Sequence, residues 1–232
     1  PPPPPPPPPF FFSTHKTPPP ILSGLVGSEM CIRDSYNLWK KDINLLKELG
    51  VNAYRFSISW PRIFPKGTEN SPNIKGLDFY SRLIDNLLEN DIRPFITLNH
   101  WDIPQHLEDM GGWPSRIMVD AFTKYAFYVS KTLGDKSKDW ITHNEPWCIS
   151  YKGYIEGAFP PGLKNDWSKS IATTHHLLLS HGMAIPVIKS NSKEAQVGIT
   201  LNLTPAVPAS NSTYDLDECN RFDGVFNSCL LY

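Results

Sequence analysis

Hydrophobic residues between positions 36 and 203 follow two alternating patterns. Four segments have apolar residues three or four positions apart and are predicted helices, at about 39–50, 77–89, 118–133 and 166–189. Each is followed by a short run rich in apolar, β-branched or aromatic residues, and these runs are predicted strands at 51–60, 92–101, 140–145 and 196–203. Helix and strand therefore alternate four times, which predicts parallel βα units.

Glycine, proline and aspartate residues predict where these helices begin, end or bend. Gly50 and Gly134 come directly after periodic segments and are predicted helix stops, and Asp166 is placed to cap the fourth helix. Pro186 falls inside that helix, where it removes a backbone donor, so we expect a kink or a shortened helix. Asn220 to Tyr232 carries mixed signals and gives no clear prediction.

Residues 1–35 differ from the rest of the chain. They contain half of all the prolines, in Pro1–Pro9 and Pro18–Pro20. A nine-proline run favours polyproline II, which suits either an SH3 or WW ligand or a tail without function. However, Ser23–Ser35 resembles the translation of a sequencing adapter. We therefore expect a non-native or disordered head over 1–35 and a folded domain, truncated at its C-terminus, over 36–232.

Composition excludes several classes of function. The 232 residues carry a formal net charge of -1, which gives no electrostatic reason to bind nucleic acid or an anionic membrane. No apolar run approaches the roughly 18–20 residues that span a bilayer. The four cysteines show no paired metal-binding spacing. We expect reduced thiols in a cytoplasmic protein, with no metal or other cofactor.

The strand predicted at 140–145 ends in the most informative motif. Pro146 cannot donate to a sheet ladder, so the strand should stop there and leave Glu145 at its carboxyl end, directly after the neutral amide of Asn144. In a barrel of alternating strands and helices, that end carries the chemistry. A carboxylic acid can protonate a leaving group there, and an amide can hold a sugar hydroxyl.

Two other strands carry polar groups toward the same rim. Arg55 lies in an otherwise apolar strand, where it is either part of a structural ion pair or a cation that keeps a catalytic carboxylate ionised. His100 at a strand end is more often a structural histidine than a ligand. It is followed by Trp101, which offers a sugar an apolar face and an N–H donor. The combination of these residues with Glu145 is stronger evidence for a functional site than each residue alone.

Five motifs give the chain a recognisable likeness. They are 49–63 (LGVNAYRFSISWPRI), 98–104 (LNHWDIP), 111–113 (GGW), 140–147 (WITHNEPW) and 197–202 (VGITLN). In this order and spacing they resemble family-one glycoside hydrolases, the β-glucosidase and β-galactosidase group. The resemblance covers about Tyr36 to Asn227, roughly half of a family member.

The resemblance implies a (β/α)8 barrel, of which this chain would form about strands 2 to 5, and retaining hydrolysis of small-molecule β-glycosides. It implies that Glu145 is the general acid/base and that Arg55 lies beside the nucleophile. Substrate-binding roles follow for a larger set, which comprises His100 and Trp101 at the non-reducing sugar, Asn144 at the 2-hydroxyl and Trp147 near the aglycone. His143 stands where the family usually has Phe, a change expected to be tolerated.

The sequence also departs from the family pattern. It lacks the Thr-Glu-Asn-Gly motif that carries the family's nucleophile, so we expect this chain to be inactive alone while the full-length parent hydrolyses β-glucosides. Three alternatives stay open: another barrel family sharing Asn-Glu-Pro, such as a cellulase-like endoglycosidase; a non-catalytic, sugar-binding pseudo-glycosidase; and an adaptor that uses its proline head. The motifs around Arg55 and His100 argue against the first, and the adapter-like segment argues against the last.

Overall fold

The computed structural model describes residues 26–227, with side chains from residue 36 onward. The proline run and most of the predicted head therefore lie outside the described residues. In chain order the elements are α1 (Val26–Glu48), β1 (Ala53–Ser57), α2 (Trp60–Ile63), α3 (Ile74–Glu89), β2 (Arg93–Asn99), α4 (Gln105–Asp109), α5 (Ile117–Leu133), β3 (Asp139–Asn144), the π-helix η1 (Cys148–Glu156), α6 (Trp167–Asn191), β4 (Gln196–Thr200) and α7 (Thr213–Phe226).

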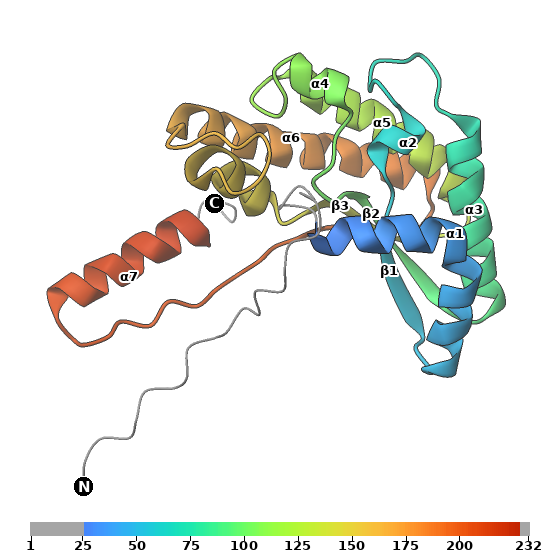
Figure 1. The fold of residues 1–232 in the computed structure, drawn as a ribbon, viewed down its shortest axis with the longest axis horizontal. Coiled ribbons are helices and arrows are strands. Elements are labelled where there is room, and N and C mark those ends of the chain that lie inside the picture. Colours follow the sequence, from blue (N-terminus) through green and yellow to red (C-terminus); the bar gives the residue numbers. More distant parts are fainter. Residues whose placement is uncertain (1–25, 228–232) are drawn as a thin grey trace, which may run out of the picture.

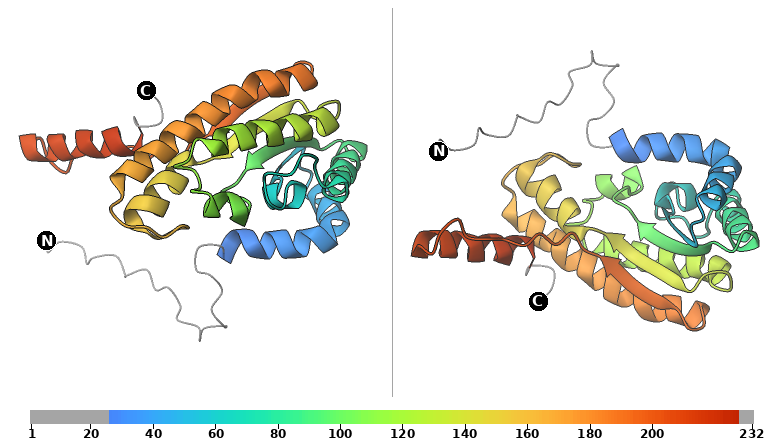
Figure 2. Two further views of the ribbon diagram at one scale, coloured as in Figure 1. Left: turned by 90° about the horizontal axis from the view of Figure 1, so that it is seen from above. Right: turned by 90° about the horizontal axis from the view of Figure 1, so that it is seen from below.

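The four predicted strands form one parallel sheet in the order β1-β2-β3-β4. Each of the first three strands is followed by helices that return the chain to the next strand, and α3, α5 and α6 lie along the same side of the sheet (Figure 1; Figure 2). This arrangement is part of an α/β barrel, so the predicted fold class is confirmed.

The two faces of the sheet differ in burial. On the face toward the helices, Ile96, Leu98 and Trp140 are at most 1% exposed and belong to one apolar core. On the opposite face, which corresponds to the barrel interior, Arg55 and Gly198 are exposed. The alternation of strand side chains thus separates a packed outer face from a polar inner face, and the chemical groups lie on the inner face.

The observed elements differ from the predicted ones mainly at their ends. The helix α1 begins at Val26, well before its predicted start, and the boundary predicted at residue 36 stays a prediction. The strand predicted at 51–60 is paired only over Ala53–Ser57, because Trp60 already begins α2. Pro61 lies in the first turn of that helix, where its missing N–H costs no hydrogen bond.

The fourth helix agrees with the prediction at its start. Asp166 caps α6 by accepting a hydrogen bond from the backbone N–H of Lys169 at 3.0 Å. Pro186 does not end the helix, which continues to Asn191. Ala184 and Ile188 on either side of this proline are fully buried, and their packing offsets the lost backbone hydrogen bond.

Besides α2, three segments have structure that the periodicity did not predict: α4, η1 and α7. The helix α7 projects away from the body of the molecule (Figure 1; Figure 2), and it contributes no buried residue. Its start is still well defined, because the hydroxyl of Ser212 accepts a hydrogen bond from the N–H of Asp215 at 3.1 Å. Within residues 26–227, no helix combines the length and the apolar character that crossing a membrane requires.

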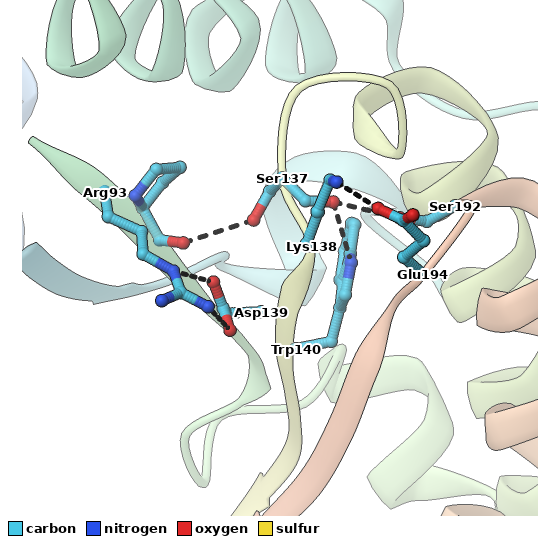
Figure 3. A network of polar contacts seen from close by, with 8 residues as sticks. Arg93, Ser137, Lys138, Asp139, Trp140, Ser192 and Glu194 are labelled. Carbon is cyan, nitrogen blue, oxygen red and sulfur yellow. Dashed lines mark hydrogen bonds and ion pairs between the residues drawn. The ribbon is translucent and has the colours of Figure 1, made fainter. Parts of the chain in front are cut away.

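The amino-terminal ends of the strands form a rim in which polar groups are paired (Figure 3). Arg93 donates two hydrogen bonds to the buried carboxylate of Asp139, at 2.5 and 2.7 Å, and so joins β2 to β3. The carbonyl of Ser137 accepts from the Ser192 hydroxyl at 2.9 Å and from the Trp140 indole at 3.2 Å. These contacts tie the start of β3 to its neighbours.

Candidate active site

Residues from three strand ends meet at the carboxyl-terminal rim, around the side chain of Asn144. Arg55 on β1 donates from Nη2 to Asn144 Oδ1 at 2.5 Å and from Nε to Thr97 Oγ1 on β2 at 2.9 Å. His100, directly after β2, lies with Nε2 3.2 Å from Asn144 Nδ2. The structure therefore brings together Arg55, His100 and Asn144, three of the six residues predicted for the site.

These contacts fix the orientation of the Asn144 amide. A guanidinium only donates hydrogen bonds, so the atom facing Arg55 must be the amide oxygen. The Nδ2 group then faces His100, whose Nε2 accepts and whose Nδ1 carries the proton. One Nδ2 hydrogen is used in this way, and the second is left to hold an incoming hydroxyl.

A register irregularity in β3 aims Asn144 at the inner face. The pairing of β3 with β4 shifts between Ile141 and Asn144. Thr142 and His143 are consecutive, yet both reach α6: Thr142 Oγ1 lies 2.7 Å from His181 Nδ1, and His143 Nε2 lies 2.9 Å from the Ser180 hydroxyl. Two successive residues on one side are the mark of a bulge, and such features often re-aim a side chain beside an active site.

His143 is part of the core. Its ring is fully buried, 4.3 Å from the ring of Phe122 and 5.3 Å from that of Trp113. Burial, with a smaller contribution from nearby His181, lowers the pKa of His143 to about 3. The imidazole therefore fills an aromatic position as a neutral ring, and its one described partner is the Ser180 hydroxyl.

Glu145 follows Asn144 in an unusual backbone conformation. Its φ is +46°, and its N–H donates to the carbonyl of Thr200 at 2.8 Å, so the carboxyl end of β3 is tied to β4. Trp101 also has positive φ, +81°. Non-glycine residues rarely adopt such angles, which cost of order 1–3 kcal/mol each and concentrate at functional sites.

The carboxyl group of Glu145 is half-buried and lies against a cysteine. Cys148 Sγ, in the first turn of η1, lies 3.4 Å from Glu145 Oε2. Asn202 Nδ2 donates to the same sulfur at 3.6 Å. Burial first, and then the hydrogen bond to Glu145, raise the pKa of Cys148 to about 12. The thiol therefore stays protonated and can donate to the carboxylate.

The charges around this rim act on two further groups. Burial lowers the pKa of Arg55, and the negative charge of Glu145 opposes that effect. Burial and then the charge of Arg55 lower the pKa of His100. His100 is therefore neutral at pH 7; its Nε2 accepts from Asn144, which leaves its Nδ1–H as the donor for a ligand.

Trp101 belongs to the rim, although its N–H is already used. The indole donates to the backbone carbonyl of Asn144 at 3.0 Å, so the expected N–H donor to a sugar is engaged in this conformation. The ring itself lies 5.0 Å from the rings of His100 and Phe159. Trp101 is half-buried, and the role predicted for it in binding a sugar stays a prediction.

Trp147 lies in a separate aromatic cluster. It is 7% exposed, and its ring contacts those of Tyr151 at 4.6 Å and Phe226 at 4.3 Å. Its place at the start of η1 puts it two residues after Glu145, but neighbouring rings cover it. The role predicted for Trp147 near an aglycone stays a prediction.

The part of the chain that the structure describes holds no cluster of three potential metal ligands. Cys148 and Cys219 are free thiols there. The side chains of Cys31 and Cys229 lie outside the described residues.

Sequence reasoning missed three residues, two of which touch predicted ones. Thr97 precedes Asn99 by two positions on the face that carries Arg55, so strand alternation contained the signal for it. Asn202, which contacts Cys148, belongs to a motif that received no role. Cys148 follows Glu145 by three residues, but its contact requires the turn into η1, which periodicity does not predict.

Comparison with known proteins identifies the family of the chain. The family model described as glycosyl hydrolase family 1 matches residues 20–229. Beta-glucosidase A of Acetivibrio thermocellus is 48% identical over 197 residues, which are 85% of this chain and 43% of that protein. Beta-glucosidase A of Thermotoga maritima is 43% identical over 212 residues, which are 91% of this chain and 46% of that protein.

Solved structures give the same result. A family 1 β-glucosidase from Thermotoga maritima superposes with a TM-score of 0.80 at 42% identity, and the match covers 83% of this chain and 43% of that one. Virulence factor SghA of Agrobacterium tumefaciens, solved with its substrate analog salicin, gives 0.81 at 41% identity over 84% of this chain and 43% of that one. This chain spans less than half the length of these relatives, and it belongs to glycosyl hydrolase family 1.

Proposed function

We propose that this chain is the acid/base part of a retaining β-glucosidase-like enzyme that hydrolyses β-O-glycosidic bonds. The observation that carries the proposal is the rim itself. Glu145 stands beside the oriented amide of Asn144, with Arg55 and His100 bound to that amide. An acid next to a fixed sugar-binding amide suits cleavage of an acetal.

In the proposed mechanism, Glu145 gives its proton to the glycosidic oxygen as the bond to the anomeric carbon breaks, and the aglycone leaves as an alcohol. A carboxylate nucleophile takes the sugar as a covalent ester. Glu145, now ionised, then removes a proton from a water molecule that attacks the anomeric carbon, and free sugar is released. The second Nδ2 hydrogen of Asn144 holds the 2-hydroxyl during both steps.

The nucleophile is the missing part of this scheme. Retaining glycosidases need two carboxyl groups about 5–5.5 Å apart, and the sequence has no Thr-Glu-Asn-Gly motif. We therefore propose that the nucleophile belongs to a longer parent protein, called here the full-length protein, which contains this chain and reaches the length of its relatives. The substrate we propose is a small-molecule β-glycoside, as suggested by relatives named β-glucosidase.

The chain by itself is proposed to be inactive. Among residues 26–227, the two outer strands, β1 and β4, each pair on one side only. Ala53, Arg55, Gln196 and Gly198 of these strands face water. Unpaired edges of this kind favour aggregation or a loosely packed state.

A cytoplasmic location also stays a prediction.

The test is hydrolysis of a nitrophenyl β-glucoside by the full-length protein and by residues 36–232 alone. We expect turnover by the full-length protein and a fall of about 10²–10⁴-fold in its Glu145→Gln variant. Residues 36–232 alone should show no more turnover than the same fragment carrying Glu145→Gln. A full-length protein whose Glu145→Gln variant keeps full activity would contradict the proposed acid.

The second candidate is a non-catalytic, sugar-binding pseudo-glycosidase. It is compatible with the geometry of the rim, where Asn144, His100 and Trp101 present polar groups and an aromatic ring whether or not a nucleophile is present. A full-length protein that binds glucosides in calorimetry without hydrolysing them would favour it.

A further inference from the structure

One group beside the proposed acid is not used by the mechanism, namely the thiol of Cys148. It is 4% exposed and lies 3.4 Å from Glu145 Oε2, three residues later in the chain. A buried polar group in contact with a half-buried carboxyl influences both its position and its protonation. The contact therefore bears on the acid directly.

The thiol is itself oriented by a second residue. Asn202, two residues beyond the end of β4, donates from Nδ2 to Cys148 Sγ at 3.6 Å. With its sulfur lone pairs facing this amide, the S–H bond is left to point at the carboxylate of Glu145. The raised pKa of Cys148 keeps that hydrogen in place at neutral pH.

We propose that Cys148, oriented by Asn202, is a positioning residue for the general acid/base Glu145. The S–H group is a weak donor. It fixes the rotamer of the carboxyl group without stabilising the ionised form as strongly as a hydroxyl or a cation would, which suits a group that must carry a proton and then give it up. The inference rests on the proposed function of Glu145.

The contact itself is tested without any measurement of activity. The infrared S–H stretching band of Cys148 in the full-length protein is assigned by its loss in Cys148→Ala. In Glu145→Ala, the acceptor is removed whatever its protonation state, and we expect the band to move to higher frequency. A band unchanged in Glu145→Ala would overturn the inference even if that variant is inactive.

The consequence for catalysis is tested by kcat and KM for an alkyl β-glucoside, which needs a proton from Glu145. In Cys148→Ala, kcat should fall about tenfold at little-changed KM because the acid is no longer held in place. Asn202→Ala should lower kcat in the same way but by less, and Cys148→Ser, which keeps a donor at this position, should restore most of it.

The matched control is Cys219→Ser, which removes a thiol in α7 and should leave kcat unchanged. A Cys148→Ala enzyme with unchanged kcat, or a Cys148→Ser enzyme that behaves like Cys148→Ala, would show that Cys148 only fills space. Failure of the proposed function gives a different result, namely a Glu145→Gln enzyme with full activity.

Discussion

The sheet carries an arginine at each of its two rims, and the two are used in opposite ways. Arg93, at the amino-terminal rim, binds the buried carboxylate of Asp139 with two hydrogen bonds (Figure 3). Arg55, at the carboxyl-terminal rim, binds the neutral Thr97 and Asn144. The charge of Arg93 is neutralised within the described fold. Arg55 instead holds an amide, and its positive charge remains available.

The pKa values follow this difference. The hydrogen bonds and charge of Asp139 raise the pKa of Arg93, whereas burial lowers that of Arg55. The comparison indicates that the amino-terminal rim serves stability and the carboxyl-terminal rim serves chemistry, a division found generally in barrels of this type.

The largest effect should come from replacing each of the two arginines in turn. In the full-length protein, Arg55→Leu should lower kcat/KM by about 100-fold, since Asn144 loses the partner that orients it, and the Tm should change little. Arg93→Leu should do the reverse, because Asp139 keeps a buried charge without a partner, and the Tm should fall by a few degrees at nearly unchanged kcat/KM. Kinetics and thermal unfolding of both variants check this, and equal effects on activity would remove the distinction between the rims.

The second effect concerns pH, and it lies in the layer between the sheet and α6. His143 has a pKa of about 3 in the folded protein and an ordinary value near 6.5 when unfolded. The unfolded chain therefore binds the extra proton first as pH falls. Stability should be lost between pH 6.5 and pH 3, by about 1.4 kcal/mol for each pH unit below 6.5.

Replacing His143 by Phe tests this effect. The variant should lose that part of the pH dependence, since Phe fits the ring position beside Phe122 and does not titrate. Denaturant unfolding at pH 7 and pH 5 measures the difference, and exposed His175→Gln serves as the control. An unchanged pH slope in His143→Phe would contradict the assignment.

The smallest effect should come from a single hydrogen bond at the amino-terminal rim. Ser192→Ala removes the donor to the Ser137 carbonyl and should cost about 1 kcal/mol of the free energy of unfolding. The pH profile of activity should stay the same. A kinetic change in this variant would show that the two rims are coupled.

The sequence was sufficient for the order and type of the main elements. Strand alternation and helical spacing located β1 to β4, α3, α5 and α6, because these elements each turn one face toward the apolar core and β1 and β4 alternate between exposed and half-buried residues. It was insufficient for α7, which buries no residue, and for η1, whose i to i+5 hydrogen bonds leave no simple period.

The candidate site also divides into parts that the sequence could predict and parts that it could not. Arg55, His100, Asn144 and Glu145 could be placed on one rim, since parallel strands end at the same edge. The bulge that turns His143 outward and Asn144 inward, and the turn that brings Cys148 to Glu145, depend on long-range pairing with β4 and on η1. The surroundings of Trp147 could not be predicted from the sequence either, because its neighbour Phe226 lies far along the chain.

The central claim, that Glu145 is a proton donor, is tested most directly by varying the leaving group. In the full-length protein, Glu145→Ala should lower the rate of sugar transfer to the enzyme about 10³-fold for an alkyl β-glucoside, which needs protonation, and far less for a dinitrophenyl β-glucoside, which leaves without it. An equal loss for both substrates would contradict the account.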